Sequence, residues 1–304
     1  MIHQLDQRAR QNYDRIATLM ILVCVSIVGP PLTPGQTERV RGDGQLVHPR
    51  ILQTEVPGRR TELKTLQGAV LYTGTSFKAN GKVPLVVHFH GAPWLVQYHI
   101  AEHCPHAALI TVQLGAGSSV YARPFEKTDA FEKLIDEARR ELALSSEWSS
   151  ITLTGFSAGY GAIRAILRDK KSFSRVNNVL LLDGIHASYL PEGVALSKGG
   201  VIKAADLDSF VKFGREAVAG KKTFVISHSA IFPAAYASTT ECTNFLIETL
   251  GLKRIMSSVE RNGMQQRSVV DVKGFHVRGY SGSTAIDHVD HIHLMPQWLR
   301  LLPI

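Results

Sequence analysis

Short apolar runs bounded by turn residues recur along the chain from about residue 60 onward. Their length and their content of β-branched residues predict strands. Most of the runs are continuously apolar, which is typical of strands that are buried on both faces in a parallel sheet covered by helices. The predicted strands are 64–73, 83–89, 108–114, 150–154, 178–182, 223–227 and 269–275.

Segments with helical periodicity lie between these runs. In 128–144, apolar residues at 131, 134, 135, 138 and 142 form one face of a helix. Further helices are predicted over 159–167, 207–217, 240–250 and about 297–302. Strands that alternate with helices predict an α/β fold, a doubly wound and mostly parallel sheet with helices on both faces. In such sheets the ligand binds at the carboxyl ends of the strands.

The N-terminal segment has a different pattern. A polar stretch, 1–15, precedes an apolar run, 16–29, which ends at Pro30-Pro31. The run is shorter than the roughly 20 residues of a membrane span but fits an export signal. We therefore expect residues 1–34 to be an export signal or N-terminal anchor with a linker, residues 35–304 to be one domain, and the protein to be periplasmic or secreted. Because the cleavage region is poor, an uncleaved anchor stays open, as does a core helix.

Composition narrows the class of protein. Of the 304 residues, 44% are hydrophobic and 20% charged, which indicates a globular chain with a sizeable core. The net charge is +8, but the basic residues are scattered and cluster at most in pairs, so we expect no nucleic-acid partner. Membrane contact is expected only through an N-terminal anchor.

Cys24, Cys104 and Cys242 have no metal-ligand spacing, and we expect the last two to be free and buried, with a disulfide as the alternative.

The strongest chemical signal is the segment 150–162. A predicted strand runs into Gly155, and a helix is predicted just after Ser157. Small residues at 155 and 159 permit a sharp turn that lifts the Ser157 hydroxyl clear of the sheet, at a helix N-terminus. There the backbone N–H of Ala158 is placed to stabilise an oxyanion.

This segment, Gly155-Phe156-Ser157-Ala158-Gly159, resembles the nucleophile elbow of the α/β-hydrolase superfamily, in particular its serine esterases and lipases. The order of strands, helices and loops follows the superfamily over roughly residues 60 to 302. The resemblance implies an α/β-hydrolase fold and catalytic domain for residues 35–304, with Ser157 as the nucleophile.

The resemblance also implies an oxyanion loop after the predicted strand 83–89. A His-Gly pair follows that strand, and similar loops in esterase-like members supply the second oxyanion N–H, here that of Ala92. The loop departs from the family's HGGG form, since Pro93 has no N–H to donate. Trp94 and Tyr98 are then expected to line the substrate pocket.

The acid of a serine triad should end a strand after the elbow. The usual place, after 223–227, has no carboxylate, and the first one downstream, Glu241, stands at a predicted helix start. Asp183 follows four apolar residues and precedes a glycine, which puts it at the carboxyl end of a buried strand. Some superfamily members carry the acid there, so we predict Asp183 as the acid.

The base is expected in the histidine-rich segment 285–296, where the superfamily's histidine belongs. We predict His288, the first histidine after a turn-rich loop, with His291 as the next candidate and His293 also open. The histidines together with Asp290 could instead bind a metal. We expect no metal and no cofactor, because the elbow already accounts for a histidine here.

These residues predict a serine hydrolase that cleaves a carboxylic ester, or a related acyl bond, through an acyl-enzyme. The expected partner is a small or polymeric ester substrate. Three alternatives stay open: acyl transfer by the same triad, a catalytically silent binding protein on the same scaffold, and a zinc-dependent hydrolase. The fold and triad do not fix the substrate.

Overall fold

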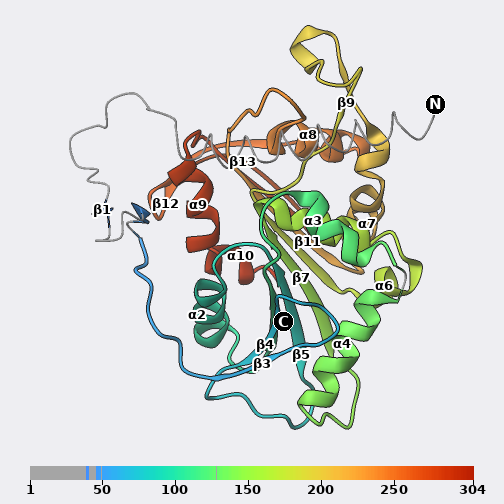
Figure 1. The fold of residues 1–304 in the computed structure, drawn as a ribbon. Helices are drawn as coiled ribbons and strands as arrows, with labels where there is room; N and C mark the ends of the chain where they lie inside the picture. The colour runs from blue at the N-terminus through green and yellow to red at the C-terminus, as the bar shows by residue number, and fades with distance from the viewer. Residues whose placement is uncertain (1–38, 41–45, 49, 128) are drawn as a thin grey trace, which may run out of the picture.

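The computed structural model describes residues 39–40, 46–48, 50–127 and 129–304 (Figure 1). A ten-stranded sheet forms the centre, in the order β12-β13-β14-β11-β8-β7-β5-β6-β4-β3. Its strands are β3 (Arg59–Glu62), β4 (Ala69–Thr73), β5 (Pro84–Phe89), β6 (Ala108–Val112), β7 (Ser150–Phe156), β8 (Asn178–Leu182), β11 (Thr223–His228), β12 (Ile255–Arg261), β13 (Met264–Val272) and β14 (Phe275–Tyr280). Two small hairpins lie outside it: β1 (Arg39–Val40) with β2 (Leu46–Val47), and β9 (Tyr189–Leu190) with β10 (Val201–Ile202).

The six central strands, from β6 to β14, run parallel to one another. The strands at both edges, β3 and β4 on one side and β12 and β13 on the other, pair antiparallel. The predicted fold class, a mostly parallel doubly wound α/β sheet, is therefore confirmed. Because the central strands run the same way, their carboxyl ends meet at one edge of the sheet, where the chemistry is expected.

Helices cover both faces of the sheet (Figure 1). Residues of α4, α5, α7 and α8 belong to one buried apolar cluster, and residues of α2, α9 and α10 belong to another. Successive residues of a central strand, such as Leu181 and Leu182, enter opposite clusters, which explains why these strands are continuously apolar. The helices are α2 (Pro93–His103), α3 (Ser118–Ala122), α4 (Ala130–Glu141), α5 (Tyr160–Ile166), α6 (Lys170–Arg175), α7 (Asp208–Val218), α8 (Thr239–Thr249), α9 (Ala285–His293) and α10 (Pro296–Leu299).

Two segments predicted as single strands each contain a turn. The segment 64–73 is the end of a hairpin, in which a turn through Gly68 (φ +82°) separates β3 from β4. The segment 269–275 spans a second hairpin, since the chain reverses at Lys273, also in the left-handed region (φ +49°), between β13 and β14. In both cases a left-handed residue turns the chain inside the segment that was predicted as one strand.

Two helices beside the site were missed. α2 follows the oxyanion loop directly and begins at Pro93, a residue favoured in the first turn of a helix. α9 contains the histidine-rich segment and is started by a capping box, in which Thr284 and Asp287 exchange side-chain-to-backbone hydrogen bonds. Thr284-x-x-Asp287 was a readable signal for this helix.

The predicted leader, residues 1–34, lies outside the described residues. Within the described part of the chain, no helix is long and apolar enough to span a membrane. Cys104 and Cys242 are buried and free, as expected, whereas Cys24 lies in the part not described.

Candidate active site

The turn at Ser157 has the strained geometry that the motif predicts. β7 ends at Phe156, and Ser157 follows with φ +48°, a left-handed conformation that non-glycine residues seldom adopt. A 3₁₀ turn (Ser157–Gly159) then leads into α5. The half-buried serine thus stands between the carboxyl end of a central strand and the start of a helix.

Two glycines let neighbouring backbone approach this turn. A Cβ on Gly159 would lie 2.1 Å from the carbonyl oxygen of Phe89, at the end of β5. A Cβ on Gly184 would lie 2.2 Å from the carbonyl oxygen of Ser157. The turn is therefore held against both adjacent strand ends with no space for a side chain, which fixes the strained serine.

We expect Gly159→Ala to destabilise the fold and displace Ser157. Overpacking of this kind costs roughly 1–3 kcal/mol, and here the obstacle is backbone, which relaxes poorly. Urea unfolding and ester hydrolysis measure the two effects. Gly74→Ala is the control, because its Cβ would meet its nearest neighbour at 3.6 Å, an ordinary contact. Equal stability and activity of the two variants would contradict the prediction.

The predicted acid and base are hydrogen-bonded to each other. Nδ1 of His288, on α9, donates to Oδ2 of Asp183 at 2.7 Å, although the two residues are 105 positions apart. Oδ1 of Asp183 accepts the backbone N–H of Ser229 at 2.8 Å and the hydroxyl of Thr239 at 3.1 Å. With its Nδ1 proton donated to a carboxylate, the neutral imidazole has its lone pair on Nε2, which is the form a general base requires.

Asp183 is buried, with 2% of its surface exposed. Burial alone would raise the pKa of its carboxyl group. The nearby His291 and His288 rings and the Ser229 N–H outweigh burial and lower the pKa well below its usual range. The residue is therefore ionised at neutral pH beside His288, where it can stabilise an imidazolium.

The other two histidines of α9 have different partners. Nδ1 of His291 lies 2.9 Å from the Ser227 hydroxyl, and its ring stacks on Trp298 at 5.5 Å. The ring of His293 stacks on that of His48 at 3.8 Å. Only His288 of the three reaches Asp183 through a hydrogen bond in the described structure. Their side chains diverge, and within the described residues no three His, Cys, Asp or Glu groups converge as metal ligands.

Phe156, the residue before Ser157, lies against the predicted base. The Phe156 ring lies 4.6 Å from the His288 ring, and it also stacks on His90 at 6.0 Å. The hydrogen bonds of the described residues do not include one from the Ser157 hydroxyl to His288. Such a bond is often long in a substrate-free enzyme and shortens when substrate binds.

The expected oxyanion loop lies beside the elbow. His90 and Gly91 both have positive φ, +67° and +103°, and turn the chain away from β5. A Cβ on Gly91 would lie 2.5 Å from Ile292 and 3.4 Å from Phe156, so the loop packs directly on the elbow and on α9. Ala92 is the N-cap of α2, and Ala158 is in the 3₁₀ turn. Their roles as oxyanion donors remain predictions.

Trp94 and Tyr98 lie on α2. Both are half-buried and pack against the apolar cluster that contains Phe156 and Ile292. Their expected place in the substrate pocket remains a prediction.

Sequence reasoning missed the two residues that brace Asp183. Ser229 follows β11 at the position where an acid was first sought, and it contributes a backbone N–H instead. Thr239 begins α8, whose capping box joins Ser238 and Glu241 as the predicted helix start implied. A backbone donor leaves no signature in the sequence, whereas the capping box does.

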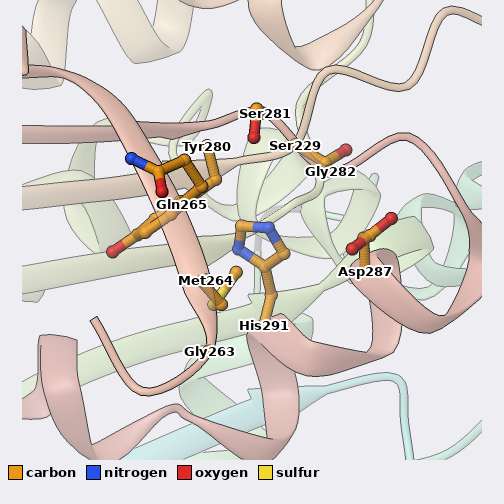
Figure 2. Close-up of a pocket in the computed structure, with 9 residues that line it drawn as sticks. All are labelled: Ser229, Gly263, Met264, Gln265, Tyr280, Ser281, Gly282, Asp287 and His291. Atoms are coloured by element: carbon orange, nitrogen blue, oxygen red, sulfur yellow. The ribbon is translucent and has the colours of Figure 1, made fainter. Parts of the chain in front are cut away.

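A polar cavity of about 130 Å³ lies between α9, the start of β13 and the end of β14 (Figure 2). Ser157 does not line it, so it is distinct from the expected acyl site. Nε2 of His291 is buried and has no hydrogen-bond partner among the described residues. The lining residues are Ser229, Gly263, Met264, Gln265, Tyr280, Ser281, Gly282, Asp287 and His291.

Buried histidines should make the fold sensitive to acid. Burial lowers the pKa of His228 and His291 to about 4, against about 6.5 in an unfolded chain. Below pH 6.5 the unfolded state binds more protons, so stability falls as pH drops from 6.5 toward 4, by about 1.4 kcal/mol per pH unit for each such histidine. We expect His228→Asn to reduce this slope in denaturant unfolding measured at several pH values; an unchanged slope would contradict it.

The comparisons with known proteins find similarity in structure alone. The sequence matches no family model and no curated protein. Among solved structures, a Pyrococcus horikoshii acylaminoacyl peptidase is 15% identical with a TM-score of 0.46, over 82% of this chain and 42% of its own. A Thermogutta terrifontis esterase 2 phosphorylated by paraoxon is 13% identical with a TM-score of 0.44, over 88% and 100%. A feruloyl esterase module from Clostridium thermocellum, complexed with sinapinate, is 13% identical with a TM-score of 0.44, over 88% and 96%.

Proposed function

We propose that the chain is a serine hydrolase of the α/β-hydrolase superfamily that cleaves a carboxylic ester or a related acyl bond. The observation that carries the proposal is the 2.7 Å hydrogen bond between Asp183 and His288, together with the left-handed Ser157, whose backbone packs against Gly184, the residue after Asp183. A carboxylate that orients a histidine next to a strained serine at a strand-to-helix turn is the arrangement that activates a hydroxyl.

In the proposed reaction, Nε2 of His288 takes the Ser157 proton as the hydroxyl attacks the ester carbonyl. Asp183 stabilises the imidazolium, and the N–H groups of Ala158 and Ala92 stabilise the oxyanion. His288 then gives its proton to the leaving alcohol, and the acyl group remains on Ser157. Water, deprotonated by His288, attacks this acyl-enzyme and releases the acid and free serine.

A fluorophosphonate probe tests the proposal, because it phosphonylates only an activated serine. We expect one adduct, which peptide mass spectrometry locates on Ser157, and loss of hydrolysis of p-nitrophenyl acetate in parallel with labelling. Heat-unfolded protein is the control and should not be labelled. Two outcomes would contradict the proposal: hydrolysis that persists in fully labelled protein, and folded protein that takes up no label.

Acyl transfer to an alcohol uses the same acyl-enzyme, and product analysis separates it from hydrolysis. We expect free acid as the main product when a small alcohol is added at millimolar concentration. Predominant formation of the new ester would reassign the chain as an acyltransferase on the same serine.

A further inference from the structure

Helix α9 carries His288, and three of its residues fasten it to separate parts of the fold. His288 is hydrogen-bonded to Asp183, which follows β8, and His291 to Ser227 in β11. Both lie on one face of the helix, since they are three residues apart. The third anchor, Asp290, points about 200° around the helix from His288 and is held by a segment from the beginning of the described chain.

Asp290 forms a bidentate ion pair with Arg50. Nε of Arg50 lies 2.5 Å from Oδ1 of Asp290, and Nη2 lies 2.7 Å from Oδ2. Nη1 of Arg50 donates to the carbonyl oxygen of Asn262, in the turn between β12 and β13. One guanidinium therefore joins three segments that are distant in sequence: the stretch before β3, the β12–β13 hairpin and α9.

The Arg50–Asp290 pair is largely shielded from solvent. Only 6% of the Asp290 side chain and 25% of the Arg50 side chain are exposed. Nε2 of His48 also lies 2.9 Å from Oδ1 of Asp290. Burial would raise the pKa of Asp290, but Arg50 and His48 outweigh it and lower the pKa. A buried carboxylate without its partner would be strongly unfavourable, so α9 should shift when Arg50 is lost.

We infer that Arg50 and Asp290 are positioning residues, which hold α9 from the face opposite His288 so that the imidazole stays aligned with Asp183 and Ser157. The inference rests on the proposed function for its catalytic consequence. The His288 and His291 bonds hold one face of the helix, and the Arg50–Asp290 pair holds the opposite face. A shift of about 1 Å in a catalytic group can lower the rate by about 100-fold.

A double-mutant cycle in the full-length protein tests the inference. We expect Arg50→Gln and Asp290→Asn each to lower kcat for p-nitrophenyl acetate by roughly 10- to 100-fold, with KM changed less than about threefold. Because the two residues act as a unit, the double variant should be no slower than the worse single variant. Arg50→Lys should recover only part of the rate, since an ammonium group cannot bind both carboxylate oxygens in the same plane.

A second ion pair serves as the matched control. Nη1 of Arg175 lies 2.7 Å from Oε2 of Glu132, and the two side chains are 24% and 7% exposed. The pair joins α6 to α4 and includes no residue of α9. Arg175→Gln and Glu132→Gln should lower the melting temperature about as much as the test variants while leaving kcat unchanged. Equal loss of kcat in both sets, or normal kcat in the test set, would overturn the inference.

A readout without turnover separates this inference from the proposed function. The His288 Nδ1 proton shared with Asp183 should give a low-field proton NMR signal in the wild type, assigned by its loss in His288→Gln. We expect the signal to shift or broaden in Arg50→Gln and Asp290→Asn and to persist in the control variants. If the test variants show this response but the wild type hydrolyses no ester, only the proposed function fails. If it hydrolyses esters and the signal is unchanged in the test variants, only the positioning role fails.

Discussion

Ser157→Ala is expected to lower kcat for p-nitrophenyl acetate by about 10⁴- to 10⁶-fold, the range over which loss of a triad nucleophile acts in serine hydrolases. Attack on the carbonyl has no substitute in this site once the hydroxyl is gone. The substitution removes one oxygen from a half-buried side chain, so the free energy of unfolding measured with urea should change little. Stopped-flow kinetics should also show the loss of any burst of p-nitrophenol.

Ser119→Ala is the control for this variant. Ser119 is a half-buried serine on α3, which packs beside α5, but it is not part of the proposed triad. Its variant should hydrolyse the ester at the wild-type rate and take up the fluorophosphonate probe. A Ser157→Ala protein that keeps more than about one hundredth of the wild-type rate would identify another nucleophile, since triad loss costs far more.

Asp183→Asn is expected to have the next largest effect, a loss of about 10⁴-fold in kcat. The carboxylate accepts three hydrogen bonds, from His288, Ser229 and Thr239. An amide has one accepting oxygen and an NH₂ group, so one of these donors must face another donor. If the amide NH₂ faces His288, Nδ1 has to become the acceptor, and the proton moves to Nε2, where the base needs its lone pair.

Asp206→Asn is the matched control. Asp206 also accepts a backbone N–H, that of Ser188 at 2.9 Å, but it ends the 3₁₀ turn Ala204–Asp206 and makes no hydrogen bond to His288. This variant should lose some stability and no activity. Full activity in Asp183→Asn would show that the Asp183–His288 bond is structural, and the base would have to be sought elsewhere.

The local features of the fold were predictable because they are encoded by neighbouring residues. The buried central strands are continuous apolar runs, and β8 was predicted with its observed bounds, Asn178–Leu182. The elbow was identifiable because a strand, two small residues and a serine occur within one short segment. Asp183 was identifiable because a carboxylate at the end of a buried strand needs a partner.

The features that sequence reasoning missed depend on contacts between distant segments or on single turn residues. Both hairpins were predicted as single strands because one left-handed residue, such as Lys273, reverses the chain within the segment. The brace on Asp183 comes partly from a backbone N–H, which every residue but proline has. The Arg50–Asp290 pair joins residues 240 positions apart, and neither residue is unusual in its local context.

By itself the sequence determined a mostly parallel α/β sheet, the position of its strained serine turn and a short list of acids and bases. Hydrophobic periodicity and steric demands on the backbone act over a few residues, so they can be read from the chain. Only the tertiary structure decided which of the three histidines of α9 meets Asp183. That choice depends on how the helix is rotated against the sheet, and packing of Trp298, Ser227 and Arg50 around it sets the rotation.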